Sequence, residues 1–68
     1  MSVSSTWTVA GMTCEHCVAS VTEEISEIPG VESVRVTLED GSVVVDSAQP
    51  LEREQVSAAV TEAGYRLS

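Results

Sequence analysis

An α+β fold in the element order β-α-β-β-α-β is predicted by three features of this chain of 68 residues. Short segments either alternate polar with apolar residues or carry a run of valines, as strands of a sheet do. Two other segments repeat apolar residues at steps of three and four, which is typical of amphipathic helices. Glycine and proline lie between these segments, where they end one element before the next begins.

The first strand is expected at residues 6–9, with Trp7 as a core residue, and Gly11 ends it. Residues 11–17 then form a loop that runs into the first helix. Pro29 and Gly30 stop this helix, because the residue before a proline avoids helical dihedrals and glycine accepts a positive φ. The apolar stripe of the helix comprises Val18, Val21, Ile25 and Ile28. Three residues lie off the stripe and should be solvated: Glu23, Glu24 and Glu27.

The second half of the chain gives a hairpin, a helix and a short last strand. A strand from about Val31 to Leu38 leads into Asp40 and Gly41, a pair that predicts a two-residue type I′ turn. Residues 42–47 form the returning strand. Pro50 suits the first position of the second helix, where its missing N–H costs nothing. The apolar side of that helix comprises Leu51, Val56, Ala59, Val60 and Ala63, followed by Gly64 as the left-handed residue at its end and a strand at residues 65–67.

This order is the ferredoxin-like split βαβ plan, in which an antiparallel four-stranded sheet packs both helices on one face. At this length we expect residues 1–68 to be a single domain, since a second one would have no core of its own. The core is thin, so a large cofactor pocket or a multi-residue catalytic cleft is not expected. No Ser/His/Asp arrangement, phosphate-binding glycine loop or pair of carboxylates in a cleft suggests catalysis, and we expect a protein that is not an enzyme.

Charge and apolar patterning exclude several classes of partner. The chain has 11 acidic residues, three arginines and no lysine, with a formal net charge of −8. Such a chain repels nucleic acid and anionic lipid, so its partner should present a basic face. No apolar run approaches the ~18–20 residues of a membrane span, and residues 1–5 lack the features of a secretory signal. We expect a cytoplasmic protein, complete from Met1 to just past its last strand.

Cys14 and Cys17 carry the chemistry. A disulfide between them would close too short a loop to staple the fold, and paired thiols in a reducing cytosol indicate metal binding or redox chemistry. The positive end of a helix stabilises thiolates at this position. Two thiolates select a soft ion, and Cu(I) tolerates two ligands, whereas Zn(II) prefers four. In a surface loop, such an ion can accept a third thiolate from a partner.

The run Gly11-Met12-Thr13-Cys14-Glu15-His16-Cys17 resembles the GMTCxxC signature of the heavy-metal-associated domain family. Matching segments follow at residues 29–31, 34–36 and 63–65, and the resemblance spans residues 7–67. The family is ferredoxin-like, and it includes CopZ-like bacterial copper chaperones and the N-terminal domains of copper-transporting P-type ATPases. The resemblance implies Cu(I) bound by Cys14 and Cys17 and handed to the metal-binding domain of such an ATPase.

Three residues near the cysteines are candidates for supporting the thiolates without being the main ligands. His16 would tune them or act as a ligand in a bridged dimer, unless it is only a solvated loop residue. Met12 is expected as an apolar anchor under the loop, as the resemblance implies, rather than as a thioether ligand. Tyr65 would donate a hydrogen bond to the site or shield it. The acidic group on the first helix would offer a docking surface to a basic partner: Glu15, Glu23, Glu24 and Glu27.

These features favour a cytosolic Cu(I) chaperone that is monomeric without metal and can form a copper-bridged dimer. One alternative is a metal-binding domain excised from a P-type ATPase. A second is a copper-buffering protein that forms thiolate-bridged dimers, and a third is a small thiol–disulfide oxidoreductase. Mercury, cadmium and zinc would also bind two thiolates, so the sequence leaves the identity of the ion open.

Overall fold

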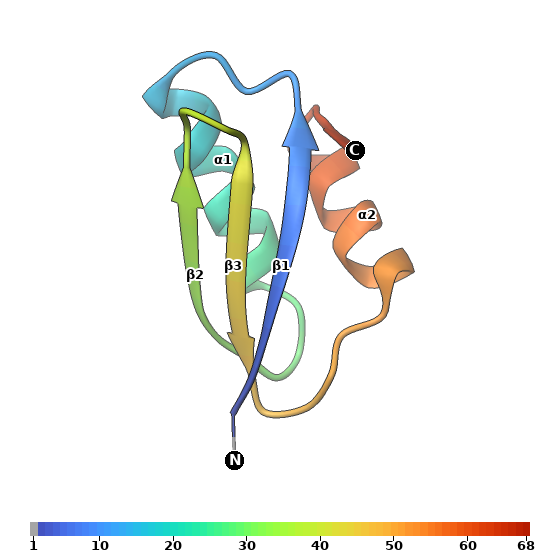
Figure 1. Cartoon of the computed structure of the whole chain (residues 1–68). Coiled ribbons are helices and arrows are strands. Elements are labelled where there is room, and N and C mark those ends of the chain that lie inside the picture. The colour runs from blue at the N-terminus through green and yellow to red at the C-terminus, as the bar shows by residue number, and fades with distance from the viewer. Residues whose placement is uncertain (1) are drawn as a thin grey trace.

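A computed structural model describes residues 2–68 and contains four strands and two helices in the expected order. Figure 1 shows this arrangement. The elements are β1 (Val3–Ala10), α1 (Glu15–Ser26), β2 (Val31–Thr37), β3 (Ser42–Ser47), α2 (Arg53–Glu62) and β4 (Arg66–Leu67). The predicted β-α-β-β-α-β order is therefore confirmed, although β1 begins three residues earlier than its alternating pattern indicated, and β4 is one residue shorter.

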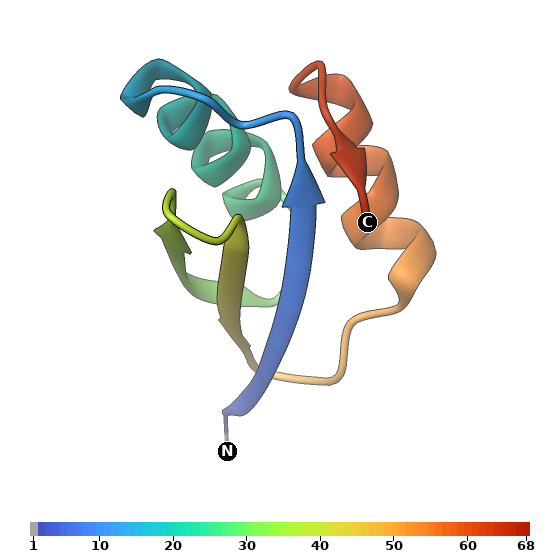
Figure 2. The ribbon, with the colours of Figure 1, turned by 45° about the horizontal axis from the view of Figure 1, so that its top comes forward.

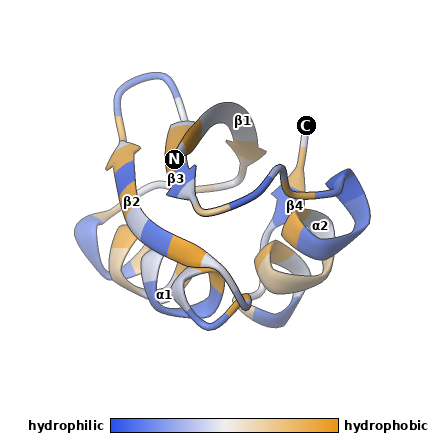
Figure 3. Cartoon of the chain, turned by 90° about the horizontal axis from the view of Figure 1, so that it is seen from below, coloured by the Kyte–Doolittle hydropathy of each residue, from blue (hydrophilic) through white to orange (hydrophobic). Residues whose placement is uncertain are grey.

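The strands form one antiparallel sheet in the order β2-β3-β1-β4, and both helices lie on one face of it (Figures 2 and 3). This is the predicted ferredoxin-like architecture. Strands β1 and β2 are not neighbours, because β3 pairs between them. Helix α1 therefore connects the end of β1 to a strand two positions away, and the loop before it crosses from the end of β1 toward the β2 side of the sheet (Figure 1).

The core between helices and sheet is aliphatic. Six of its side chains are completely buried: Val21, Ile25, Val43, Val45, Val56 and Val60. The chain has no phenylalanine, so branched side chains supply nearly all the fully buried volume. Each such side chain contributes about 1.5–3 kcal/mol through burial. Trp7 only partly fulfils its predicted core role: it packs against this core but stays half-buried, and its Nε1 donates a hydrogen bond to Ser5 Oγ at 3.0 Å.

The buried stripe of α1 differs from the predicted one. Cys17, Val21 and Ile25 are buried, whereas Val18 is only half-buried. Ile28 lies beyond the helix, which ends at Ser26, and packs half-buried against the core. The predicted stripe began at Val18, whereas the buried face runs from Ile25 through Val21 back to Cys17 at steps of four. Cys17, one of the two candidate ligands, therefore lies on the face of α1 that packs against the core.

The start of α2 also differs from the prediction. Pro50 precedes the helix, which begins at Arg53 with Glu52 as its N-cap. The Gln55 side chain accepts a hydrogen bond from the Glu52 N–H at 3.0 Å, and this capping interaction fixes the helix start three residues beyond the proline. Leu51 consequently packs on the core from outside the helix. At the other end, Gly64 has a φ of +93° and terminates α2 as predicted.

The β2–β3 connection is not the predicted type I′ turn. Thr37 pairs with Ser42, so the loop has four residues, and Leu38 belongs to it rather than to the strand. A type I′ turn needs a positive φ at both central residues, but of Asp40 and Gly41 only the glycine has one, at +73°. The Asp40 carboxylate instead accepts a hydrogen bond from the Ser42 N–H at 3.0 Å and holds the longer turn.

In residues 2–68, no helix has the length and hydropathy needed to cross a membrane.

Candidate metal centre

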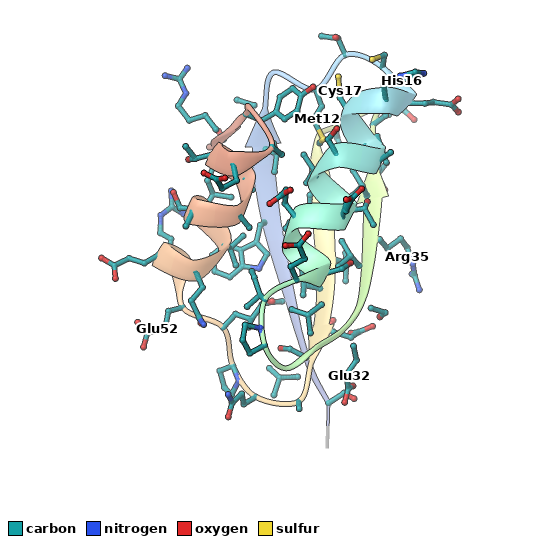
Figure 4. All side chains as sticks on the ribbon, turned by 180° about the vertical axis from the view of Figure 1, so that it is seen from behind. Met12, His16, Cys17, Glu32, Arg35 and Glu52 are labelled. Atoms are coloured by element: carbon teal, nitrogen blue, oxygen red, sulfur yellow. The ribbon has the colours of Figure 1, made fainter. Side chains whose placement is uncertain are left out.

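The loop that carries the candidate site connects β1 to α1 (Figure 4). Gly11 begins it with a φ of +92°, and the Tyr65 ring lies 3.5 Å from the position that a Cβ on this glycine would occupy. Met12 is half-buried and packs against the hydrophobic core, the anchoring position expected for it. A left-handed residue at one end and an apolar anchor next to it therefore fix the path of the loop.

The two sulfur atoms meet because Cys14 is the N-cap of α1. Its backbone is extended, with φ −155° and ψ 170°, while its carbonyl oxygen already accepts hydrogen bonds from the N–H groups of Cys17 at 3.0 Å and Val18 at 3.3 Å. The first turn of the helix thus returns Cys17 to the level of Cys14. The Sγ atoms of the two cysteines are 3.2 Å apart, and both thiols are free.

The two cysteines differ in how firmly they are held. Cys17 is 7% exposed and continues the buried stripe of α1, whereas Cys14 is exposed at the end of the loop. One sulfur is therefore fixed by the core and the other faces solvent. This asymmetry gives an incoming group direct access to Cys14.

The environment stabilises a thiolate at Cys17. Its pKa is lowered from the ordinary value of 9.0 to about 6, first by a hydrogen bond from the Tyr65 hydroxyl, then by the backbone of Thr13 and the side chain of Cys14. Burial of the sulfur opposes this effect. The same interaction raises the pKa of Tyr65, because the phenol keeps its proton to donate to the sulfur. At neutral pH, Cys17 is thus in the form that binds metals.

No other cluster of candidate ligands competes with this pair in residues 2–68. That part of the chain contains no group of three or more His, Cys, Asp or Glu side chains placed to hold a metal ion. His16 lies between the cysteines in sequence and is exposed on the first turn of α1. The arrangement is an open two-sulfur site rather than a closed four-ligand cage, and such a donor set suits soft ions.

Two contributors to the site were not found by sequence reasoning. The backbone of Thr13 helps to lower the pKa of Cys17, and no residue-type pattern reports a backbone donor. Anchoring of Cys17 in the core was missed because the apolar stripe of the helix was counted from Val18. The signal for it was present, since Cys17 precedes Val21 and Ile25 at steps of four.

The acidic residues of α1 surround the site only in part. Glu15 and Glu23 are exposed on the helix, and Glu27 is exposed at its C-cap. Glu24, expected in solvent, is instead half-buried, and desolvation followed by repulsion from nearby glutamates raises its pKa. Glu62 of α2 is one of these neighbours, because the two helices pack side by side. Helix α1 contains no lysine or arginine, so it presents a negative surface from the loop to its C-terminus.

Comparison with known proteins identifies the family of the chain. The heavy-metal-associated domain matches residues 6–66 of the chain. A COP-associated protein of Helicobacter felis is 39% identical over 59 residues, which cover 87% of this chain and 89% of that protein. The copper chaperone CopZ of Bacillus subtilis is 38% identical over 58 residues, or 84% of each chain.

Similar segments also occur in larger proteins and in solved structures. Copper-transporting ATPase 2 of Rattus norvegicus is 34% identical over 61 residues, which cover 88% of this chain and 4% of that protein. The structure of a CopZ metallochaperone superposes with a TM-score of 0.88 at 31% identity, covering 97% of this chain and 100% of that one. The fold, the matched residues and these relatives agree, and the chain belongs to the heavy-metal-associated domain family.

Proposed function

We propose that residues 1–68 form a single metal-binding domain that acts as a Cu(I) chaperone, with Cys14 and Cys17 as the two ligands. One observation carries the proposal: two free sulfurs lie 3.2 Å apart at the start of a helix, where hydrogen bonds lower the pKa of Cys17 to about 6. Cu(I) is stable with two thiolate ligands, whereas Zn(II) would need two more. The similarity to copper chaperone CopZ supports copper as the cargo.

Loading the ion requires a small, local movement. Metal–sulfur bonds of about 2.3 Å place two collinear sulfurs about 4.6 Å apart, which is about 1.4 Å more than in the metal-free site. Cys17 is held by the core face of α1, so Cys14 is the residue that moves. Because Cys14 is the exposed end of the loop, the rest of the fold can stay in place.

Release follows from the same asymmetry. An ion held by only two sulfurs can accept a third thiolate, and the exposed Cys14 side is open to one. A partner with its own thiol pair takes the ion by successive ligand exchange, so no covalent bond of a substrate is made or broken and the chain is a carrier rather than an enzyme. The partner is the metal-binding domain of a copper-transporting P-type ATPase, and the exchange takes place in the cytoplasm, where thiols remain reduced.

The electrostatic surface supports a basic partner. The chain has a net charge of −8, and the exposed glutamates of α1 begin next to the loop. Complementary charge accelerates the encounter and leaves it sensitive to salt. Transfer to the partner should therefore slow as ionic strength rises, and a transfer rate that is independent of salt would remove this part of the proposal.

An anaerobic Cu(I) titration tests the central claim. The reduced protein is titrated against a competing chelator while the ultraviolet thiolate-to-copper absorption is followed. We expect about one ion per chain, lost in both Cys14→Ser and Cys17→Ser. Met12→Leu is a matched control, because it preserves the apolar anchor and removes the thioether. Binding that survives both cysteine replacements would overturn the proposal, and binding lost in Met12→Leu would make the thioether a ligand.

The same titration distinguishes the role of His16. If His16 only faces solvent, His16→Ala leaves Cu(I) affinity and copper-driven dimerisation unchanged. Sedimentation at increasing Cu(I) concentration detects thiolate-bridged dimers. A chain that stays monomeric at all copper concentrations would show that such dimers do not form. Uptake of several ions per chain in such dimers would favour copper buffering over transfer.

A second candidate function rests on the similarity to copper-transporting ATPase 2. The chain matches a segment that makes up 4% of that protein, so an equivalent site can serve as a metal-binding domain within a transporter. The ligands would be the same, and the difference lies in whether the domain delivers the ion to an ATPase or receives it within one. The length of the natural reading frame distinguishes the two.

A further inference from the structure

The sheet leaves part of β1 without a neighbour on one side. Strand β3 pairs with β1 from Val3 to Thr8, but β4 pairs only with Val9 and Ala10. A last hydrogen bond runs from the Ser68 N–H to the Thr8 carbonyl at 2.7 Å. Figure 2 shows β4 beside the arrow end of β1 only. In the described part of the chain, no strand pairs with this side of residues 3–7.

The hydrogen-bond pattern identifies the backbone groups that face this open edge. The Val9 N–H donates to Gly41 on the β3 side, whereas the Thr8 carbonyl accepts on the β4 side. Successive residues of a strand alternate between the two sides. Ser4 and Thr6 therefore direct their N–H and C=O groups away from β3, and both residues are exposed.

Protection against strand addition is uneven between the two edges of the sheet. Edge strands usually carry charges, proline or bulges that prevent another strand from pairing. Strand β2 has Glu32, Arg35 and an irregular register between Val31 and Ser33. Strand β1 has the sequence VSSTWTVA, without a charge, a proline or a glycine, in a chain whose net charge is −8. The β1 edge is thus the one that can accept a strand.

The arrangement favours a single extended peptide over a second copy of this chain. Helix α2 packs beside β4 on the helix-bearing face, so it flanks the line along which an added strand would continue (Figure 3). Two copies paired through β1 would bring their α2 helices to the same place, and each copy carries a net charge of −8. A lone strand brings no helix, and a basic one is attracted.

Side-chain alternation specifies the composition of that peptide. A residue added opposite Ser4 lies on the helix-free face, where Asp46 of β3 is directly opposite Ser4 and accepts a hydrogen bond from Ser33. The added residue and Asp46 are two strand spacings apart, about 9.5 Å. A lysine side chain at the added position can span most of this distance. The residues before and after it lie opposite Ser5 and Val3 and face the helix-bearing side of the sheet, the side on which half-buried Trp7 packs against the core.

We propose that the open edge of β1 at residues 3–7 binds an extended basic peptide, in which lysine or arginine alternates with apolar residues, as a fifth strand antiparallel to β1. The peptide pairs with the backbone of Ser4 and Thr6. This edge is at the end of β1 remote from the metal loop, so both sites can be occupied at once. A partner whose flexible segment holds this edge raises the effective concentration of its own thiols at Cys14 and Cys17. That consequence rests on the proposed chaperone function, whereas peptide binding itself does not.

Hydrogen exchange and NMR titration test the proposal on the reduced, metal-free chain. The probe is the heptapeptide Lys-Val-Lys-Val-Lys-Val-Lys with acetylated and amidated ends. We expect fast amide exchange of Ser4 and Thr6 in the free protein, slowed about tenfold or more at saturating peptide. The amides of Ser5 and Trp7 already face β3 and should not change. Affinity should fall as salt rises, and the matched peptide with glutamate in place of lysine should not bind.

Two variants at one position separate backbone pairing from side-chain contact. Thr6→Pro removes an outward N–H without removing a bond to β3 and should weaken peptide binding about tenfold, while Thr6→Ala should retain it. Slow exchange of Ser4 and Thr6 before peptide is added, no slowing afterwards, or equal binding of the glutamate peptide would overturn the proposal. Self-association of the free chain that Thr6→Pro abolishes would overturn the choice of occupant. If Thr6→Pro does not fold, the exchange measurement on the natural chain decides alone.

Discussion

Replacing Tyr65 by phenylalanine removes the largest single cause of the low pKa at Cys17. The hydroxyl is lost, but the ring remains to pack beside Gly11, where its Cδ1 lies 3.5 Å from the position of a would-be Cβ. The perturbation is therefore confined to one hydrogen bond to the sulfur. We expect the fold and the loop to be unchanged, and the Cys17 thiol to titrate at higher pH.

The structure sets the size of this effect. Four interactions lower the pKa of Cys17 from 9.0 to about 6 against the opposing effect of burial, and the Tyr65 hydrogen bond is the largest of them. Its removal should raise the titration midpoint by about one pH unit. The thiolate fraction would then fall about ninefold at pH 5, but by less than about a tenth at pH 8. Because metal binding requires the thiolate, the apparent Cu(I) affinity should follow the same pattern.

Two measurements on the reduced protein provide the assay. Ultraviolet thiolate absorbance against pH gives the midpoint directly, and the raised pKa of Tyr65 keeps the phenol transition at the alkaline end. Competition titrations at pH 5 and pH 8 give the Cu(I) affinity. Thr13→Ala is the matched control, because Thr13 acts through its backbone and the substitution leaves that group in place.

Either of two results would refute this reasoning. An unchanged midpoint in Tyr65→Phe would mean that the hydroxyl does not stabilise the thiolate. An equal loss of affinity at pH 5 and pH 8 would mean that the hydroxyl acts on the bound ion or on the loop rather than on the proton. A shift in the Thr13→Ala control as large as that of Tyr65→Phe would indicate that the loop itself had moved.

Three further predictions concern the stability of the fold, each measured by urea unfolding. Ile25→Ala should lower the free energy of unfolding by about 2–5 kcal/mol, because Ile25 is completely buried; a loss below about 1 kcal/mol would mean that the core collapses around the gap. Gly41→Ala should cost more than Gly64→Ala, although both have a positive φ, because its Cβ would lie 2.7 Å from the Val9 carbonyl oxygen while nothing lies within 4 Å at Gly64; equal losses would contradict this steric argument. Glu24→Gln should be more stable than the natural chain at pH 7, because the raised pKa of Glu24 means that its charged form is disfavoured in the folded state, and the difference should vanish at acidic pH where the carboxyl is protonated; a variant that is less stable at pH 7 would show a favourable contact of the carboxylate.

Local patterns in the sequence were sufficient for the order of elements and for the candidate ligands. Alternation and helical periodicity act over a few residues, so they survive in any context, and they predicted the four strands and two helices that the structure contains. The cysteine pair and its place at a helix start follow from spacing alone. Glycine at position 64 identified the end of α2 because few other residues accept its left-handed conformation.

The boundaries that depend on competing local interactions were predicted less well. The pair Asp40 and Gly41 favoured a two-residue turn, but pairing of Thr37 with Ser42 made the loop longer. Pro50 was compatible with a helix start, yet the capping interaction of Glu52 with Gln55 placed the start beyond it. In both cases, the residue types suit more than one local conformation, and strand pairing or a capping hydrogen bond selects between them.

The sequence by itself determined the element order, the thiol pair and the acidic character of this protein, because each is set by residues that are adjacent or a few positions apart. Only the tertiary structure decided the chemistry of the pair. It brought Tyr65, 48 positions after Cys17, into hydrogen-bonding contact with the sulfur, and it buried Cys17 while leaving Cys14 exposed. A pKa and an exposed fraction depend on every group within a few ångströms of an atom, and chain folding assembles those groups from distant parts of the sequence.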